Sequence, residues 1–194
     1  TVAQWYKVES SEAAYNNVPG GAFSFTELSY VSRLWRQGAA MQRADVSSMD
    51  RPHPQPGGTM RYSASLDVPG LGRIVGPQLE PRAGGPPPTK DLMKVVLREG
   101  DDYLGYLSEL RNLPYIFGSA HRYGSHQAEL GIGVDCADLA IYGLRRMGHE
   151  LRYRSSRTLG PVSVFVAEGD ARHRQAYAGD TGPIRTGSKG VQPG

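Results

Sequence analysis

The sequence predicts an α+β protein, because two different periodicities occupy different parts of one chain. Residues 59–76 alternate apolar and polar side chains, which is typical of two strands with a turn at Pro69-Gly70. Residues 136–147 instead repeat apolar side chains at the three- and four-residue spacing of a buried helix. Segments rich in proline and glycine, at 51–58 and 77–88, separate these patterns.

The strongest linker signal is Ala-Gly-Gly-Pro-Pro-Pro at 83–88. We therefore predict a domain boundary there, with a smaller mixed module at 1–88 and a second domain at 89–194. The first module is expected to bind substrate or to shape the groove of the second.

Other segments carry weaker signals. Leu28, Val31, Leu34 and Trp35 form an apolar stripe that predicts a helix, and Thr89 is a good N-cap for another. Residues 167–194 have little helix or strand signal. The predicted elements are helices at 25–42, 89–97, 102–111 and 136–147, and short strands at 151–153 and 162–166.

Composition excludes several classes of protein. The chain has 194 residues, 39% of them hydrophobic, which is enough for one sizeable core. No run of about eighteen apolar residues predicts a transmembrane helix. The net charge is only +3 and the arginines are scattered, so nucleic acid is not an expected partner. A single cysteine excludes an intrachain disulfide.

That cysteine, Cys136, is the candidate nucleophile. Asp135 is a good N-cap, so Cys136 is predicted in the first turn of the helix at 136–147. Free backbone N–H groups and the positive end of the helix dipole favour a thiolate there. The same N–H groups can form an oxyanion hole, and the small Ala137 leaves room for a substrate carbonyl.

Two motifs around Cys136 resemble those of the NlpC/P60 cysteine peptidases. That family has a Tyr-x-Trp-Gly-Gly segment and then an Asp-Cys-Ser-Gly-Leu helix start. The chain reads Tyr-Ile-Phe-Gly-Ser at 115–119 and Asp-Cys-Ala-Asp-Leu at 135–139. Phe117, Ser119, Ala137 and Asp138 are the departures from the family pattern.

The resemblance covers about residues 90–194 and implies a papain-like domain that hydrolyses amide bonds in peptidoglycan stem peptides. Cys136 would attack the scissile carbonyl, and Tyr115 would contact the substrate or the oxyanion. The peptidoglycan peptide is then the partner, no cofactor is required, and the protein acts outside the cytoplasm, in the periplasm or after secretion.

A cysteine nucleophile of this kind needs a base, usually an imidazole. By the resemblance, residues 191–194 begin a Pro-Gly-Asp turn and the catalytic histidine follows Gly194. Among the histidines present, His173 is the only one in the usual order, because it follows both Cys136 and the strand predicted at 162–166. The others are His53 in the proline-rich connector, His121 and His126 before Cys136, and His149 beyond the far end of its helix.

Two alternatives remain open at this stage. The helix also resembles the transglutaminase-like core, in which Cys136, His173 and Asp180 would form a triad for acyl transfer or proteolysis. The other alternative is a pseudoenzyme, a non-catalytic protein with an inactive hydrolase fold that binds the cell wall or a partner through residues 1–88. We predict no metal site, since His121, His126 and Glu129 have poor ligand spacing.

Overall fold

The computed structural model describes residues 2–25, 28–38, 44–51, 56–77, 92–122 and 125–159, and the strands at 168–170, 175–178 and 182–184. The chain divides into two compact units, Thr1–Ser155 and Ser156–Gly194. Strands and helices both occur, so the α+β class is confirmed. No helix among the described residues is long and apolar enough to cross a membrane.

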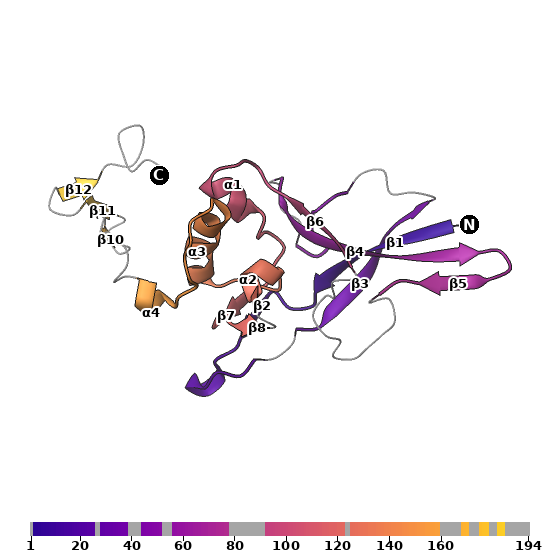
Figure 1. Cartoon of the computed structure of the whole chain (residues 1–194), viewed down its shortest axis with the longest axis horizontal. Coiled ribbons are helices and arrows are strands. Elements are labelled where there is room, and N and C mark those ends of the chain that lie inside the picture. The colour runs from indigo at the N-terminus through magenta and orange to yellow at the C-terminus, as the bar shows by residue number, and fades with distance from the viewer. Residues whose placement is uncertain are drawn as a thin grey trace. The chain divides into compact units, whose positions relative to one another are not determined.

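An antiparallel sheet forms one side of the first unit (Figure 1). Its central strands are β1 (Val2–Ser10) and β4 (Gly58–Val68), which pair from Val2↔Asp67 to Val8↔Arg61. Strand β3 (Tyr30–Gly38) lies on the other side of β1, with a register shift between Trp5 and Tyr6.

Strand β4 is long enough to pair with two further strands along its other edge. Its end forms a hairpin with β5 (Gly72–Val75), which confirms the two strands predicted around Pro69-Gly70. Its beginning pairs with β6 (Met93–Leu97), from Gly58↔Leu97 to Tyr62↔Met93. One face of this sheet buries Met60 and Tyr62 with Val46, against Trp35.

The helix predicted at 25–42 is wrong, because residues 30–38 form strand β3. Successive residues of β3 pair with successive residues of β1, and Trp35 packs on Tyr62 with 5.3 Å between the ring centroids. Hydrogen bonds to β1 outweigh the helix-like spacing of the apolar residues. Residues 26–27 and 39–42 lie outside the described residues.

The helix predicted at 89–97 is also wrong, because residues 93–97 form strand β6. This pairing has a consequence for domain organisation: β6 follows the linker at 83–88 and completes a sheet that begins before it. The predicted boundary at 88/89 therefore falls inside the first unit, which continues to Ser155. Residues 78–91 lie outside the described residues.

Short helices and strands pack beside the sheet within the first unit. Asp102 caps α1 (Tyr103–Ser108) by accepting from the Gly105 N–H at 2.7 Å. Helix α1 packs on α3, where a Cβ at Gly143 would lie 2.6 Å from the Tyr103 ring. The remaining elements are β2 (Ala14–Asn16), the 3-10 turn η1 (Pro19–Gly21), β7 (Tyr115–Phe117), β8 (His121–Arg122), β9 (Ser125–His126), α2 (Gln127–Leu130) and α3 (Cys136–Arg146).

Two small apolar clusters hold the helical part together. Leu110, Ala128, Val134 and Tyr142 form one, and Leu28, Ile116 and Ile132 form the other. A fully buried apolar side chain of this size contributes about 1.5–3 kcal/mol. Only the first cluster includes a residue of α3, Tyr142, so this cluster fixes the position of that helix, whereas the second packs the segments that precede Cys136 against one another.

The second unit contains α4 (Ser156–Leu159) and an antiparallel sheet of β10 (Glu168–Asp170), β11 (Gln175–Ala178) and β12 (Gly182–Ile184). These strands were not predicted from the polar, glycine-rich sequence. The strand predicted at 151–153 is wrong, because those residues are irregular. The strand predicted at 162–166 lies outside the described residues.

Candidate active site

The helix predicted at Cys136 is confirmed as α3, Cys136–Arg146. Asp135 caps it with Oδ1, which accepts from the N–H groups of Ala137 at 2.9 Å and Asp138 at 3.0 Å. Asp138 makes the reciprocal hydrogen bond, in which its Oδ2 accepts from the Asp135 N–H at 3.0 Å. This reciprocal capping box defines the first turn. At the other end Gly148 has φ +96° and terminates the helix as predicted.

The cap leaves one N–H group of the first turn available beside the thiol. The N–H groups of Ala137 and Asp138 are both used by Asp135. The Cys136 N–H makes no hydrogen bond among the described residues, and the Cys136 side chain is exposed. The oxyanion hole expected from the helix start is therefore reduced to the N–H of Cys136 itself.

Strand β7 brings Tyr115 next to the start of α3. The Ile116 N–H donates to Val134 O at 2.8 Å, and the Val134 N–H donates to Pro114 O at 3.1 Å. Partial burial raises the pKa of Tyr115, and the negative charges of Cys136 and Asp135 raise it further. Its side chain is 43% exposed, and its hydroxyl makes no hydrogen bond among the described residues. The Tyr115 backbone bridges to Val134, two residues before Cys136, and the Tyr115 side chain lies within electrostatic range of the thiol.

Gly133 is the residue that allows this close approach. A Cβ at Gly133 would lie 2.3 Å from Ile116 Cδ1 and 2.9 Å from Pro114 O. The segment before Asp135 can therefore pack against β7 only when position 133 has no side chain.

Behind the thiol lies a buried polar network centred on Asp138, which is 0% exposed. Its carboxylate accepts from Ser119 Oγ at 2.9 Å and from Gln127 Nε2 at 3.3 Å. Ser119 also donates to Asp135. Burial raises the pKa of Asp138 to about 6, even though hydrogen bonds from its neighbours favour the ionised form. The departures Ser119 and Asp138 from the family pattern are thus partners in one network.

His126 belongs to the same network and is a neutral imidazole. Its Nδ1 accepts from the Ala128 N–H at 3.3 Å, so the ring proton is on Nε2, which lies 3.5 Å from Asp138 Oδ1. Burial, and then the charge of His121, lowers the pKa of His126 to about 4. Contact with Asp138 is therefore not an ion pair at neutral pH. The ring also stacks on Tyr153, with 3.7 Å between centroids.

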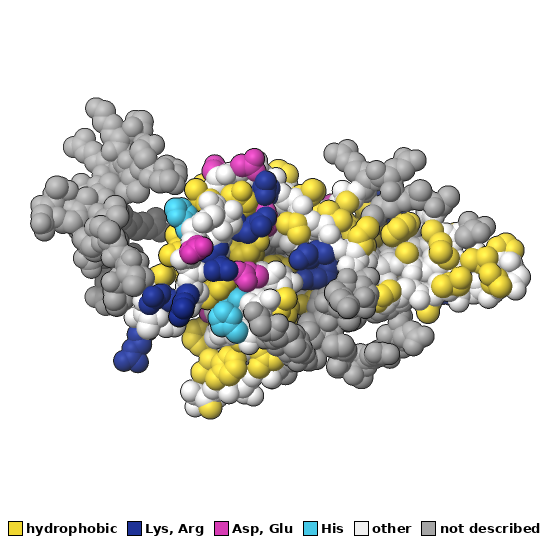
Figure 2. All heavy atoms as spheres, in the orientation of Figure 1, with side chains coloured by type: hydrophobic (Ala, Val, Ile, Leu, Met, Phe, Trp, Pro, Cys, Tyr) yellow, Lys and Arg dark blue, Asp and Glu magenta, His cyan; other side chains and the backbone are white. Residues whose placement is uncertain are grey.

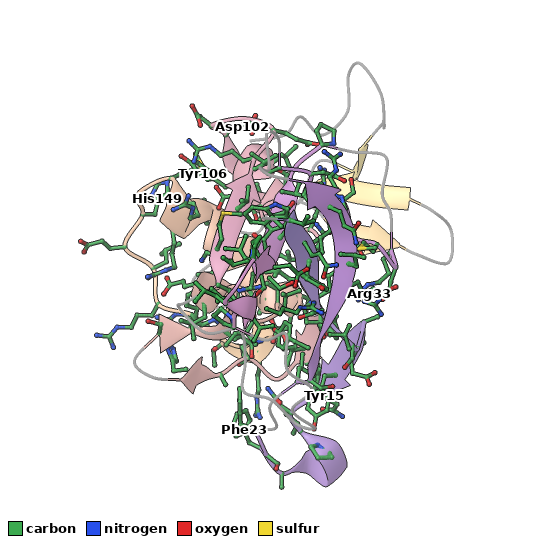
Figure 3. The ribbon with its side chains drawn as sticks, turned by 90° about the vertical axis from the view of Figure 1, so that its right-hand side faces the viewer. Tyr15, Phe23, Arg33, Asp102, Tyr106 and His149 are labelled. Atoms are coloured by element: carbon green, nitrogen blue, oxygen red, sulfur yellow. The ribbon has the colours of Figure 1, made fainter. Side chains whose placement is uncertain are left out.

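None of the described histidines supplies a base to the thiol. Cys136 makes no hydrogen bond to an imidazole among the residues described. His126 is buried against Tyr153 and Asp138, and His121 packs edge-on against the His126 ring. His149 follows the end of α3 opposite Cys136, where its N–H donates to Leu144 O at 3.1 Å. Figure 3 shows His149 in the upper part of the view and Tyr15 of β2, the strand that pairs with the one carrying Tyr115, in the lower part.

The remaining predicted site residues, His53, His173 and Asp180, lie outside the described residues. The triad of the transglutaminase-like alternative therefore has only its cysteine within the described part of the chain. No group of three or more metal-ligating side chains occurs among the described residues, His121, His126 and Glu129 included.

Sequence reasoning missed the network of Ser119, His126, Gln127 and Asp138. One local signal was present: Asp135 and Asp138 have the three-residue spacing of a capping box. The contacts of Ser119 and Gln127 with α3 depend on how the segment 119–127 folds against that helix, and no local sequence pattern predicts this.

Comparisons of the chain with protein-family models, with curated proteins and with solved structures find no match. The site must therefore be interpreted from its own geometry and from the motif resemblance.

Proposed function

We propose that the protein is a cysteine hydrolase of the NlpC/P60 kind, with a papain-like arrangement around α3. Its substrate is an amide bond in a peptidoglycan stem peptide, cleaved outside the cytoplasm. The observation that carries the proposal is the exposed Cys136 in the first turn of a capped helix, with an unbonded N–H and with Tyr115 within electrostatic range of the thiol.

The chemistry follows from these groups. The Cys136 thiolate attacks the scissile carbonyl, and the carbonyl oxygen becomes an oxyanion that accepts from the Cys136 N–H and the Tyr115 hydroxyl. Collapse of this intermediate leaves a thioester on Cys136 and releases the amine, which takes a proton from the conjugate acid of the base. Water then hydrolyses the thioester. The base comes from outside the described residues, and His173 is the candidate within the chain.

The direct test is muropeptide release from purified peptidoglycan by the whole protein and by Cys136→Ala. We expect release by the wild type and none by the variant. Cys136 is exposed, so the substitution should leave thermal unfolding unchanged, and that measurement is the control. Undiminished release by Cys136→Ala, or no release by the wild type, contradicts the proposal.

One observation favours a second candidate, a non-catalytic protein that binds the cell wall. The described residues bring no imidazole to the thiol. Thiol labelling separates the two candidates: a nucleophile reacts with iodoacetamide in the folded protein at neutral pH, whereas an inert cysteine reacts mainly after unfolding. Retention of the wild type on insoluble peptidoglycan without muropeptide release supports the second.

A further inference from the structure

A second site lies away from Cys136, in an open cavity of about 470 Å³ between the sheet and the helices. Strands β4 and β6 form one wall, and the segment 109–113 after α1, helix α2 and the last turns of α3 contribute to the other. Neither Cys136 nor Tyr115 lines it, so it is separate from the candidate active site. Its volume lies in the usual range for small-molecule sites.

Two cations lie side by side on this face of the sheet, and Lys94 is the one that lines the cavity. Arg61 of β4 and Lys94 of β6 are directly paired across the strands, so both side chains are on the same face. Arg61 is 6% exposed, and its Nη2 donates only to neutral carbonyls, Leu130 O at 3.0 Å and Gly131 O at 2.8 Å. Burial lowers the pKa of Lys94, and the charges of Arg61 and Arg146 lower it further. Like charges in this position repel unless an anion lies between them.

The carboxylates of the cavity wall are already paired. Glu109 is 3% exposed and accepts from Tyr142 at 2.7 Å and from Arg146 at 3.0 and 3.1 Å. Glu129 forms an ion pair with Arg145 at 2.6 Å. Lys94, in contrast, makes no hydrogen bond or ion pair among the described residues. The cavity therefore contains one ammonium group that pairs directly with no described carboxylate, although the charge of Glu109 acts on it and partly offsets the lowering of its pKa.

The rest of the lining is mixed: Thr59 and Arg98 are polar, with Arg98 paired to Asp101 at 2.6 Å, and the other residues are mostly apolar or small. Val96 and Leu97 follow Lys94 on β6 and are 40% and 44% exposed, and Leu110 and Leu113 lie on the helical side. Figure 2 shows dark blue Lys and Arg side chains gathered with magenta carboxylates over the helices and the adjoining end of the sheet. An apolar surface beside a single unpaired cation is suited to an amphiphilic anion.

We propose that this cavity binds a small monocarboxylate, with its carboxylate on Lys94 and its hydrocarbon part on Val96, Leu97 and Leu110. A single negative charge matches the single unpaired ammonium. A dianion such as phosphate would carry a second charge that no unpaired cation of the described lining matches, and it would leave Val96, Leu97 and Leu110 uncovered.

The test uses the whole chain and 4-phenylbutyrate as the probe, by calorimetry and by amide chemical shifts. We expect saturable binding, with the largest shifts in β6, the segment 109–113 and the last turn of α3. The uncharged analogue 4-phenylbutanamide should bind about tenfold more weakly, because it loses the charged hydrogen bond. Inorganic phosphate alone should bind more weakly than the carboxylate. Equal binding of carboxylate and amide, or tighter binding of phosphate, overturns the proposal.

Variants locate the site. Lys94→Gln should weaken 4-phenylbutyrate binding about tenfold, and Lys94→Arg, which keeps the charge, should restore most of it. Arg152→Gln is the matched control, because it removes one positive charge from an exposed residue that does not line the cavity. If Lys94→Gln and Arg152→Gln weaken binding equally, the effect is one of net charge and the proposal fails. Amide shifts around Cys136 instead of β6 also contradict it.

Discussion

At the scale of single residues, Tyr115 is the side chain whose role is separable from stability. Its hydroxyl makes no hydrogen bond among the described residues and its ring is 43% exposed. Tyr115→Phe should therefore change the free energy of unfolding by less than about 0.5 kcal/mol. If the hydroxyl holds the oxyanion, kcat for muropeptide release should fall about 10²-fold with little change in KM. An unchanged kcat would show that the hydroxyl plays no part in the reaction.

The buried pair His126 and Asp138 should give opposite pH dependences of stability. The pKa of His126 is about 4 in the folded protein, whereas its ordinary value, which applies to the unfolded chain, is 6.5. The unfolded chain therefore binds the extra proton, and the stability of the fold decreases as the pH falls from 6.5 to 4. The pKa of Asp138 is about 6, above its ordinary 3.8, so the folded protein binds the extra proton and stability rises as pH falls from 6 to 4. Each effect amounts to about 2–3 kcal/mol, and together they largely cancel.

Single variants should expose each slope in chemical unfolding measured from pH 4 to 6.5. Asp138→Asn leaves only the His126 effect, so stability should fall with acidification. His126→Asn keeps an oxygen that can accept from the Ala128 N–H and leaves only the Asp138 effect, so stability should rise. Slopes of the same sign in the two variants would contradict the assignment. The slope is the readout, because each substitution also alters hydrogen bonds.

At the scale of elements, the sequence predicts what local signals determine. Helix α3 was predicted because its cap Asp135, its apolar stripe and its terminator Gly148 all lie within the helix or beside it. Strand β3 was mistaken for a helix because the partner that decides its conformation, β1, is far away in sequence. The candidate nucleophile Cys136 is predicted from local signals of this kind. The buried network around Asp138 depends instead on contacts between segments that are distant in sequence, such as the hydrogen bond that Ser119 donates to Asp138.

The packing of β7 against residues 133–134 should determine whether Tyr115 and Cys136 are correctly placed in the candidate site. Gly133→Ala places a methyl group 2.3 Å from Ile116 Cδ1, which should cost about 1–3 kcal/mol and move β7 away from Val134. Thermal unfolding measures the cost, and muropeptide release should fall with it. Gly100→Ala is the matched control, since its nearest neighbour outside the adjacent residues is 3.7 Å away. Equal stability of the two variants would show that β7 and the loop are not tightly packed.

At the scale of the whole molecule, the linker at 83–88 does not separate two sheets. Strand β6 pairs with β4 and strand β2 pairs in parallel with β7, so each of these pairings joins residues before 78 to residues after 91. A proline- and glycine-rich sequence predicts only that a helix is unfavourable at these residues. It does not report whether the flanking segments pack together, which is why the boundary predicted at 88/89 falls inside one compact unit.

Splitting the chain tests this organisation. Fragments 1–88 and 89–194, expressed together, should copurify and unfold cooperatively, because the β4–β6 and β2–β7 pairings hold them. Each fragment alone should lack cooperative unfolding, since β4 loses part of its edge and β6 its only partner among the described strands. The control is a cut at 155/156, after which fragment 1–155 should unfold cooperatively by itself. Cooperative unfolding of the isolated fragment 89–194, measured by circular dichroism, would instead support two separable domains. Cys136 would then belong to an independently folding domain, as the sequence predicts.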